Sequence, residues 1–286
     1  MLLKQIVHFK KFTTTEQIIA NYILENTTLM ENISIQELAK RTFTSNASII
    51  RFVQKLGIKG FKEFRIQLLK SLEQLDLEAE INPNIPFEGN SSLMKISEDI
   101  MHLSQQAIKE TYHLLNEAQL MQMTKHLYHA KRIFLFASGD SQIRAESFQN
   151  KLWKINKYAI LAKDREEWAL NAANLLIDDC AFFISYDAKS ANDLFAAQMI
   201  KERGIPILLL TSFPDSELGK LSDVIITVSR LETTETEKIA TYSSQAAFEY
   251  ILNVLFSTLY QREYQENRVR QLTRAEVLQH YQEKPL

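Results

Sequence analysis

Three segments of the chain carry side chains suited to binding a polar ligand, and each follows an apolar run. They are residues 138–141 (SGDS), residues 185–190 (SYDAKS) and residues 211–212 (TS). Hydroxyl groups and the backbone amides of small residues bind phosphates and sugar hydroxyls, especially where a helix begins directly afterwards. We therefore expect a binding site for a small polar ligand where these segments meet.

A second group of polar residues lies near the N-terminus and is suited to binding DNA. Two short amphipathic segments, residues 34–42 and 45–56, are joined by a tight turn, and Gly57 ends the second. Two such helices form a helix-turn-helix, whose second helix enters the major groove with its N-terminal residues at the base edges. The predicted DNA-binding residues are Ser45, Asn46, Ser48, Arg51, Lys55 and Lys59.

The turn between these two segments holds one unusual residue, Phe43. Helix-turn-helix proteins often have glycine there, because the backbone of this turn often takes a positive φ. A positive φ would make Phe43 a strained residue, whereas an ordinary φ would make it part of the core.

The basic charge of the chain is concentrated in the same region. Residues 1–72 hold 11 lysines and arginines against 5 glutamates, a net charge of +6, although the whole chain carries −2. The rest of the chain is therefore acidic. A basic segment joined to an acidic body indicates that only the basic segment contacts a polyanion such as double-stranded DNA.

The composition is that of an ordinary globular protein. With 286 residues, 45% of them apolar, the chain can form two domains with a core each. Cys180 is the only cysteine, so no intrachain disulfide can form. The charged start is unlike a signal peptide, and no apolar run approaches the ~20 residues of a membrane helix. We expect a cytoplasmic protein with no membrane contact, metal or other cofactor.

From residue 132 onward, short apolar runs alternate with helical patterns. The expected strands are residues 132–137, 158–161, 180–185, 206–211 and 224–228. Strands that lack a polar face are buried on both sides, as in a parallel sheet covered by helices. The predicted fold class is α + α/β. An all-helical helix-turn-helix domain (residues 1–76) and a linker (77–92) precede a parallel-sheet α/β sandwich (93–286).

The N-terminal polar segment also carries a longer signature. From Ser45 to Phe64 the chain reads S-x-A-S-I-x-R-F-x-x-K-L-G-x-x-G-F-x-E-F, which resembles the helix-turn-helix of the RpiR/MurR family of bacterial transcription regulators. That family adds a SIS (sugar isomerase) domain, a parallel α/β sandwich that binds phosphosugars. The resemblance implies a DNA-binding transcriptional regulator, a repressor rather than an activator, of sugar or amino-sugar metabolism. It also implies a homodimer or tetramer, since SIS domains usually pair.

The SIS half departs from its family pattern at the predicted ligand site. Where the family has S-x-S-G-x-T, this chain has Asp187 in place of a serine and Ala188 in place of glycine. A carboxylate ~4 Å from a phosphate repels it by about 1 kcal/mol in water and by more in a cleft. The effector-binding residues that the resemblance implies are Ser138, Gly139, Ser141, Ser185, Asp187, Lys189 and Ser190.

Several interpretations of this site remain open. The site can bind an altered ligand, uncharged or amine-bearing, or it can be vestigial, with Asp187 only capping the next helix. It can also retain phosphosugar binding through its three matching serines, Ser141, Ser185 and Ser190.

Two rival functions also remain open. A phosphosugar isomerase or lyase needs a positioned acid and base, and Glu249 is a candidate base by fold position alone. The SIS domain can instead serve only as a dimerisation scaffold. We expect no enzyme activity, because no set of catalytic residues stands out in the sequence.

Overall fold

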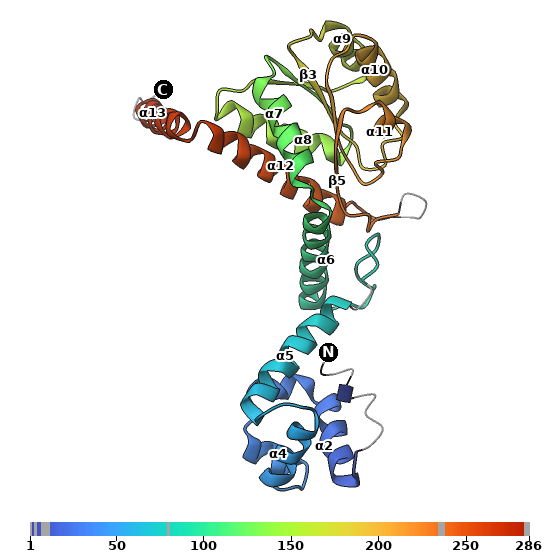
Figure 1. The fold of residues 1–286 in the computed structure, drawn as a ribbon, viewed down its shortest axis with the longest axis vertical. Helices are drawn as coiled ribbons and strands as arrows, with labels where there is room; N and C mark the ends of the chain where they lie inside the picture. The colour runs from blue at the N-terminus through green and yellow to red at the C-terminus, as the bar shows by residue number, and fades with distance from the viewer. Residues whose placement is uncertain (1, 3–4, 7–11, 79–80, 234–237, 283–286) are drawn as a thin grey trace. The chain divides into compact units, whose positions relative to one another are not determined.

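The computed structural model describes residues 2, 5–6, 12–78, 81–233 and 238–282. The chain divides into two units, Met1–Glu80 and Ile81–Leu286. Each unit has its own buried core, so each is described by itself (Figure 1). No helix of the described residues is both long and apolar enough to cross a membrane.

The first unit is built from short helices around one core. Its elements are α2 (Thr14–Glu25), η1 (Thr27–Glu31), α3 (Ile35–Arg41), α4 (Asn46–Lys55) and α5 (Phe61–Glu78). Apolar residues at helical spacing give each helix one buried face. Ile19, Leu38, Ile49, Phe52 and Phe64 meet in this core, and Phe52 lies edge-on to Phe64 with ring centroids 6.0 Å apart.

The second unit is a parallel α/β sandwich, as predicted. It begins with α6 (Leu93–Leu114) and α7 (Glu117–His129). Its strands are β1 (Ile133–Phe136), β2 (Ala159–Ala162), β3 (Cys180–Ile184), β4 (Ile207–Thr211) and β5 (Val224–Thr227). They form one parallel five-stranded sheet in the order β2-β1-β3-β4-β5. The remaining helices are α8 (Asp140–Trp153), α9 (Arg165–Asn174), α10 (Ala191–Glu202), α11 (Glu217–Leu221), α12 (Ser243–Arg262) and α13 (Tyr264–Gln282).

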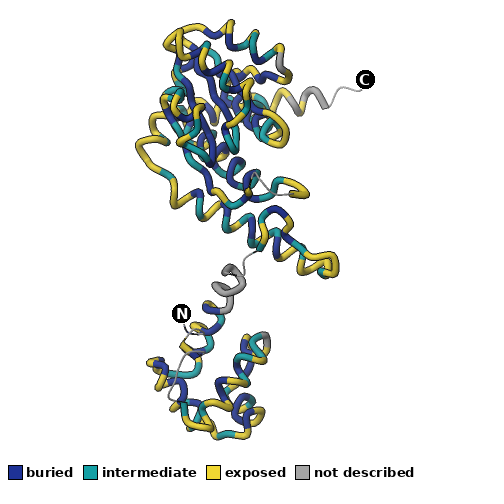
Figure 2. The backbone as a smooth tube through the Cα atoms, turned by 90° about the vertical axis from the view of Figure 1, so that its right-hand side faces the viewer, coloured by how far each residue is buried: buried dark blue, intermediate teal, exposed yellow. Residues whose placement is uncertain are grey.

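The sheet is buried on both faces, which explains why its strands read as unbroken apolar runs. Along β3, Cys180, Phe182 and Ile184 enter the core that is shared with α7, α8 and α12, whereas Ala181 and Phe183 enter the core on the other face. Figure 1 shows α9, α10 and α11 on that other side of the sheet, and Figure 2 shows the buried strands inside this unit.

The predicted linker, residues 77–92, is divided in the structure. Helix α5 continues to Glu78, and residues 81–92 belong to the second unit without forming a helix or strand. Asn84 in this segment is buried, and its backbone C=O accepts the Ile239 N–H at 3.2 Å. The part of the predicted linker from residue 81 onward is therefore attached to the loop before α12. The predicted domain limits themselves stay a prediction.

Candidate functional site

Helix α4 presents the predicted DNA-binding residues on its exposed face. Its N-terminus is capped by Ser45, whose Oγ accepts the Ser48 N–H at 3.1 Å. Ile49, Phe52 and Val53 fix the opposite face in the core. Ser45, Asn46, Arg51, Lys55 and Lys59 are exposed and Ser48 is half-buried. The structure thus brings the predicted residues together along one helix and the turn that follows it.

Lys55, one of the predicted DNA-binding residues, has a carboxylate partner in the structure. Its Nζ lies 2.6 Å from Oε2 of Glu16 on α2, and 6.0 Å from the centre of the Phe12 ring. Burial raises the pKa of Glu16, but the hydrogen bond from Lys55 and those from Thr13 outweigh it, so the pKa is lowered overall. A DNA phosphate at Lys55 would therefore compete with the carboxylate of Glu16.

The turn before α4 resolves the question that Phe43 raised. Phe43 has a φ of +51°, and its side chain is 98% exposed. It is therefore strained and lies outside the core. A side chain in this left-handed region costs roughly 1–2 kcal/mol relative to the usual backbone conformations.

The carboxyl ends of β1 and β3 open onto a cavity of about 190 Å³. The N-termini of α8 and α12 face the same cavity. Its lining residues are Ser138, Asp140, Ser141, Ile184, Ser185, Tyr186, Asp187, Glu232, Lys238, Thr241, Ser244 and Gln245. Ligands of open α/β sheets bind at this edge, so this cavity is the candidate effector pocket.

Four of the seven predicted effector residues line this pocket, namely Ser138, Ser141, Ser185 and Asp187. Gly139 lies beside it as the N-cap of α8, with a positive φ of 58°. The structure thus joins the loops after β1 and β3, which the sequence placed together.

Lys189 and Ser190 are turned away from the pocket. The Lys189 Nζ lies 5.7 Å from the centre of the Phe213 ring, in a neighbouring hollow. The Ser190 Oγ caps α10 by accepting the Asp193 N–H at 3.3 Å. The predicted alternative that Asp187 caps α10 is therefore wrong, because Ser190 does so. Asp187 instead accepts the Lys189 N–H at 3.4 Å.

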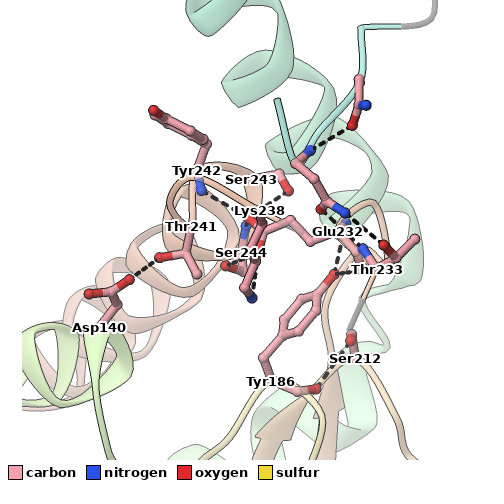
Figure 3. Close-up of polar contacts among 12 residues, drawn as sticks. Asp140, Tyr186, Ser212, Glu232, Thr233, Lys238, Thr241, Tyr242, Ser243 and Ser244 are labelled. Atoms are coloured by element: carbon pink, nitrogen blue, oxygen red, sulfur yellow. Dashed lines mark hydrogen bonds and ion pairs between the residues drawn. The ribbon is translucent and has the colours of Figure 1, made fainter. Parts of the chain in front are cut away.

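Glu232 lines the pocket although no motif in the sequence marks it as a ligand-binding residue. Its carboxylate accepts the N–H groups of Tyr242 and Ser244, both at 2.9 Å, and the hydroxyls of Ser243 at 3.1 Å and Ser244 at 2.9 Å (Figure 3). Lys238 Nζ is 3.8 Å away. The side chain of Glu232 is fully buried. It therefore occupies the anion-binding position at the N-terminus of α12.

Tyr186, just after β3, is hydrogen-bonded to the backbone of Glu232 in the loop between β5 and α12. Its hydroxyl donates to the Glu232 C=O and accepts the Glu232 N–H, both at 3.1 Å (Figure 3). Its own C=O accepts the Ser212 N–H at 3.0 Å. Burial raises the pKa of Tyr186 to about 12, so its hydroxyl stays protonated at neutral pH.

The pocket is acidic and contains unsatisfied hydrogen-bonding capacity. Asp140, Asp187 and Glu232 face it with Lys238 as the cation among its described lining residues. The Oε1 atom of Gln245 is buried without a hydrogen-bond partner among the described residues. A buried carbonyl oxygen without a partner is costly, so a ligand hydroxyl or amine that donates to it would be stabilised.

Comparison with known proteins identifies both units. Residues 1–75 match the rpiR-family helix-turn-helix domain, and residues 126–256 match the SIS domain. An HTH-type transcriptional regulator of Caldanaerobacter subterraneus subsp. tengcongensis is 31% identical over 255 residues, which cover 89% of this chain and 88% of the relative. The chain belongs to the RpiR family of helix-turn-helix transcriptional regulators. The HTH-type regulator YbbH of Bacillus subtilis is 28% identical over 257 residues, 89% of this chain and 88% of the relative.

Solved structures show that the fold of this RpiR-family regulator is shared. The NanR protein of Vibrio vulnificus, complexed with ManNAc-6P, has a TM-score of 0.61 at 24% identity and covers 99% of this chain and 100% of its own. A phosphoheptose isomerase from Francisella tularensis has a TM-score of 0.51 at 19% identity, covering 60% of this chain and 100% of its own. The SIS fold therefore occurs in a regulator and in an enzyme, so the fold alone does not decide whether a chain has enzyme activity.

The pocket of this RpiR-family regulator does not contain the candidate base. Glu249 on α12 is paired with Arg144 at 3.3 Å and with Lys151 at 2.6 Å, outside the pocket. No histidine is among the described lining residues. The carboxylate of Glu232 is held by four hydrogen bonds. The described geometry therefore offers groups that bind a polar ligand and holds Glu249 away from it.

Proposed function

We propose that this regulator is a repressor of genes of sugar or amino-sugar metabolism, and that a sugar-related ligand in the effector pocket controls its binding to DNA. It acts in the cytoplasm and is not an enzyme. The observation that carries the proposal is the pocket itself. It is lined by Ser138, Ser141 and Ser185 and by Gln245, whose carbonyl oxygen has no hydrogen-bond partner among the residues that the structure describes. The related fold of the Vibrio vulnificus NanR, complexed with ManNAc-6P, supports a ligand of the amino-sugar class.

The charges of the pocket favour a ligand rich in hydroxyl or amine donors over a phosphate ester. Asp187 replaces a serine of the family pattern, and Lys189, which could offset its charge, is directed to Phe213. Glu232 fills the N-terminus of α12, where a phosphate would otherwise be stabilised. We propose that the ligand is an amino sugar or a neutral sugar without a phosphate group.

Thermal unfolding of the full chain with matched pairs of sugars tests this proposal. Each pair consists of a plain hexose or hexosamine and its 6-phosphate. We expect the plain amino sugar to raise the unfolding temperature of the wild type more than its 6-phosphate does. The Asp187→Ser variant, which restores the residue of the family pattern, should shift this preference toward the phosphate. A larger rise with the 6-phosphate in the wild type would contradict the ligand class.

A specific set of hydrogen bonds supports a route from the pocket toward the DNA-binding unit. The Asn84 Nδ2 donates to the Thr233 Oγ1 at 2.7 Å, and the Asn84 Oδ1 accepts the Thr233 N–H at 3.3 Å. Thr233 follows Glu232, and Ile239, which also contacts Asn84, follows Lys238. A ligand that moves Glu232 or Lys238 would thus move the segment that leads back to α5.

We propose that the regulator is a homodimer or tetramer, as a palindromic operator requires. Helix α6 supports this with apolar side chains at spacings of seven residues, which lie on one face of a helix. They are Met94, Met101 and Ile108, exposed by 78%, 46% and 37%. Light scattering of the full chain tests the proposal, and a monomer at micromolar concentration would contradict it.

The two rival functions predict other results. If the SIS domain were only a scaffold, no sugar of the panel would change the unfolding temperature or the affinity for DNA. If it were an isomerase, the purified chain would convert a phosphosugar to its ketose or aldose isomer. The pairing of Glu249 with Arg144 and Lys151 argues against the isomerase.

A further inference from the structure

Phe43 has no structural role that accounts for its exposure. Its side chain is 98% exposed, the highest value among the large apolar side chains that the structure describes. The neighbouring Phe52 and Phe64, by contrast, are fully buried. A ring that is 98% exposed contributes almost no burial of apolar surface to folding.

The backbone at Phe43 makes the residue costly to keep. The Thr44 N–H donates to the Ala39 C=O at 2.9 Å, and the Phe43 N–H donates to the Lys40 C=O at 3.3 Å. This pair of hydrogen bonds is the Schellman arrangement that ends a helix, and it places Phe43 at the left-handed position where glycine or asparagine is usual. Phenylalanine thus opposes folding at this position, both by strain and by exposure.

The place of Phe43 in the fold indicates what the ring contacts. Phe43 precedes the N-cap of α4, Ser45, by two residues, and the exposed Asn46 and Arg51 follow on the same helix. In helix-turn-helix complexes this end of the second helix lies in the major groove. There the methyl group of thymine is the apolar feature of the base edges, and side chains such as phenylalanine contact it.

We propose that Phe43 reads a thymine of the operator by packing its ring against the thymine methyl group. The proposal goes beyond DNA binding by α4, because it assigns sequence preference to the turn. It also explains why a strained, exposed aromatic residue stands where glycine would fold better. The basic charge of the surrounding unit, with Lys40, Arg51 and Lys59 exposed nearby in sequence, favours DNA over a protein partner as the surface that covers the ring.

The test compares Phe43→Gly and Phe43→Asn with the wild-type full chain, on an operator selected in vitro from random duplexes. Both variants suit a left-handed backbone, so the N-terminal unit should unfold at the same or a higher temperature. Their affinity for the operator should nevertheless fall about tenfold, because the apolar contact is lost. Leu29→Asn, which removes another exposed apolar side chain of this unit, is the matched control and should leave the affinity unchanged.

A second measurement isolates the methyl group. Replacing single thymines of the operator by deoxyuridine should weaken wild-type binding about fourfold at one position. At that position the two Phe43 variants should show no such loss. The proposal is overturned if the Phe43 variants bind the operator as tightly as the wild type does. It is also overturned if their affinity falls but deoxyuridine weakens the variants and the wild type equally at every position. If the Phe43 variants change the oligomeric state and keep their affinity for DNA, the ring contacts a second copy of the chain. That result also overturns the proposed thymine contact. Arg51→Ala reports separately on DNA binding by α4.

Discussion

Replacing Asn84 by alanine should disconnect the ligand from the DNA-binding unit without removing either binding activity. The buried side chain of Asn84 forms two hydrogen bonds with Thr233, of 2.7 Å and 3.3 Å. Each is worth about 1 kcal/mol net, and a buried group left unpaired adds to the cost. The contact between this segment and the loop before α12 is therefore worth at least about 2 kcal/mol.

This free energy sets an upper limit on the effect that the contact can transmit. A ligand can change the affinity for DNA only through contacts that differ between the two states of the protein. A coupling of about 2 kcal/mol corresponds to roughly a thirtyfold change in affinity for DNA. Without the Asn84 side chain, the ligand should change that affinity by less than about threefold.

The assay is the fluorescence anisotropy of a labelled operator, titrated with and without the sugar that gives the largest thermal shift. Isothermal calorimetry measures the affinity for that sugar alone. In Asn84→Ala we expect this affinity to stay near the wild-type value, because Asn84 does not line the pocket. Asn90→Ala is the matched control, since Asn90 is exposed in the same segment.

The reasoning is refuted if Asn84→Ala keeps the full effect of the sugar on DNA binding. It is also refuted if the variant loses sugar binding itself, since Asn84 would then act on the pocket and not on the connection. Because linkage is reciprocal, DNA should also cease to change the affinity for the sugar. That result can be checked in the same calorimeter.

Two further predictions concern charged groups. Glu16→Gln keeps a residue that is compatible with the capping box at Thr13. The substitution leaves Lys55 without its counter-charge, so the affinity for DNA should rise. The slope of the logarithm of the binding constant against the logarithm of the salt concentration should steepen by up to about one. Glu25→Gln, at the other end of α2, is the control. Burial raises the pKa of Asp193 from 3.8 to about 6, so stability should fall by about 2 kcal/mol as the pH rises from 4 to 6. Denaturant titrations should show that Asp193→Asn removes this slope, and an unchanged slope would contradict the assignment.

The fold could be predicted from the sequence because its signals are local. Unbroken apolar runs such as residues 180–184 identify strands that are covered on both faces, and all five predicted strands are confirmed. The ends of parallel strands meet at one edge of the sheet, which brings Ser141 and Ser185 together at the pocket. The predicted DNA-binding residues remain a prediction, although the exposure of five of the six along α4 and the turn after it agrees with the prediction.

The rest of the pocket could not be predicted because it depends on contacts between distant segments. Glu232 stands in a polar stretch, RLETTETEK, whose composition resembles that of a solvated loop. Its burial follows only from its position against the start of α12. The direction of Lys189 depends on the left-handed backbone of Ala188, with a φ of +52°, which alanine does not predict.

Whether a ligand displaces the Glu232 carboxylate, and with it Thr233 and Asn84, depends on the charge of the ligand. A neutral sugar can bind while Glu232 keeps its four hydrogen bonds, so the attached Thr233 and Asn84 stay in place. A phosphate that enters the N-terminus of α12 must displace this carboxylate, because two anions cannot share one set of donors. We therefore expect Glu232→Gln to increase affinity for a hexose 6-phosphate about tenfold or more and to leave affinity for the plain neutral hexose nearly unchanged. Calorimetry measures the affinity of the wild type and of the variant for each of the two sugars. If the variant and the wild type bind the 6-phosphate equally well, the phosphate does not approach α12.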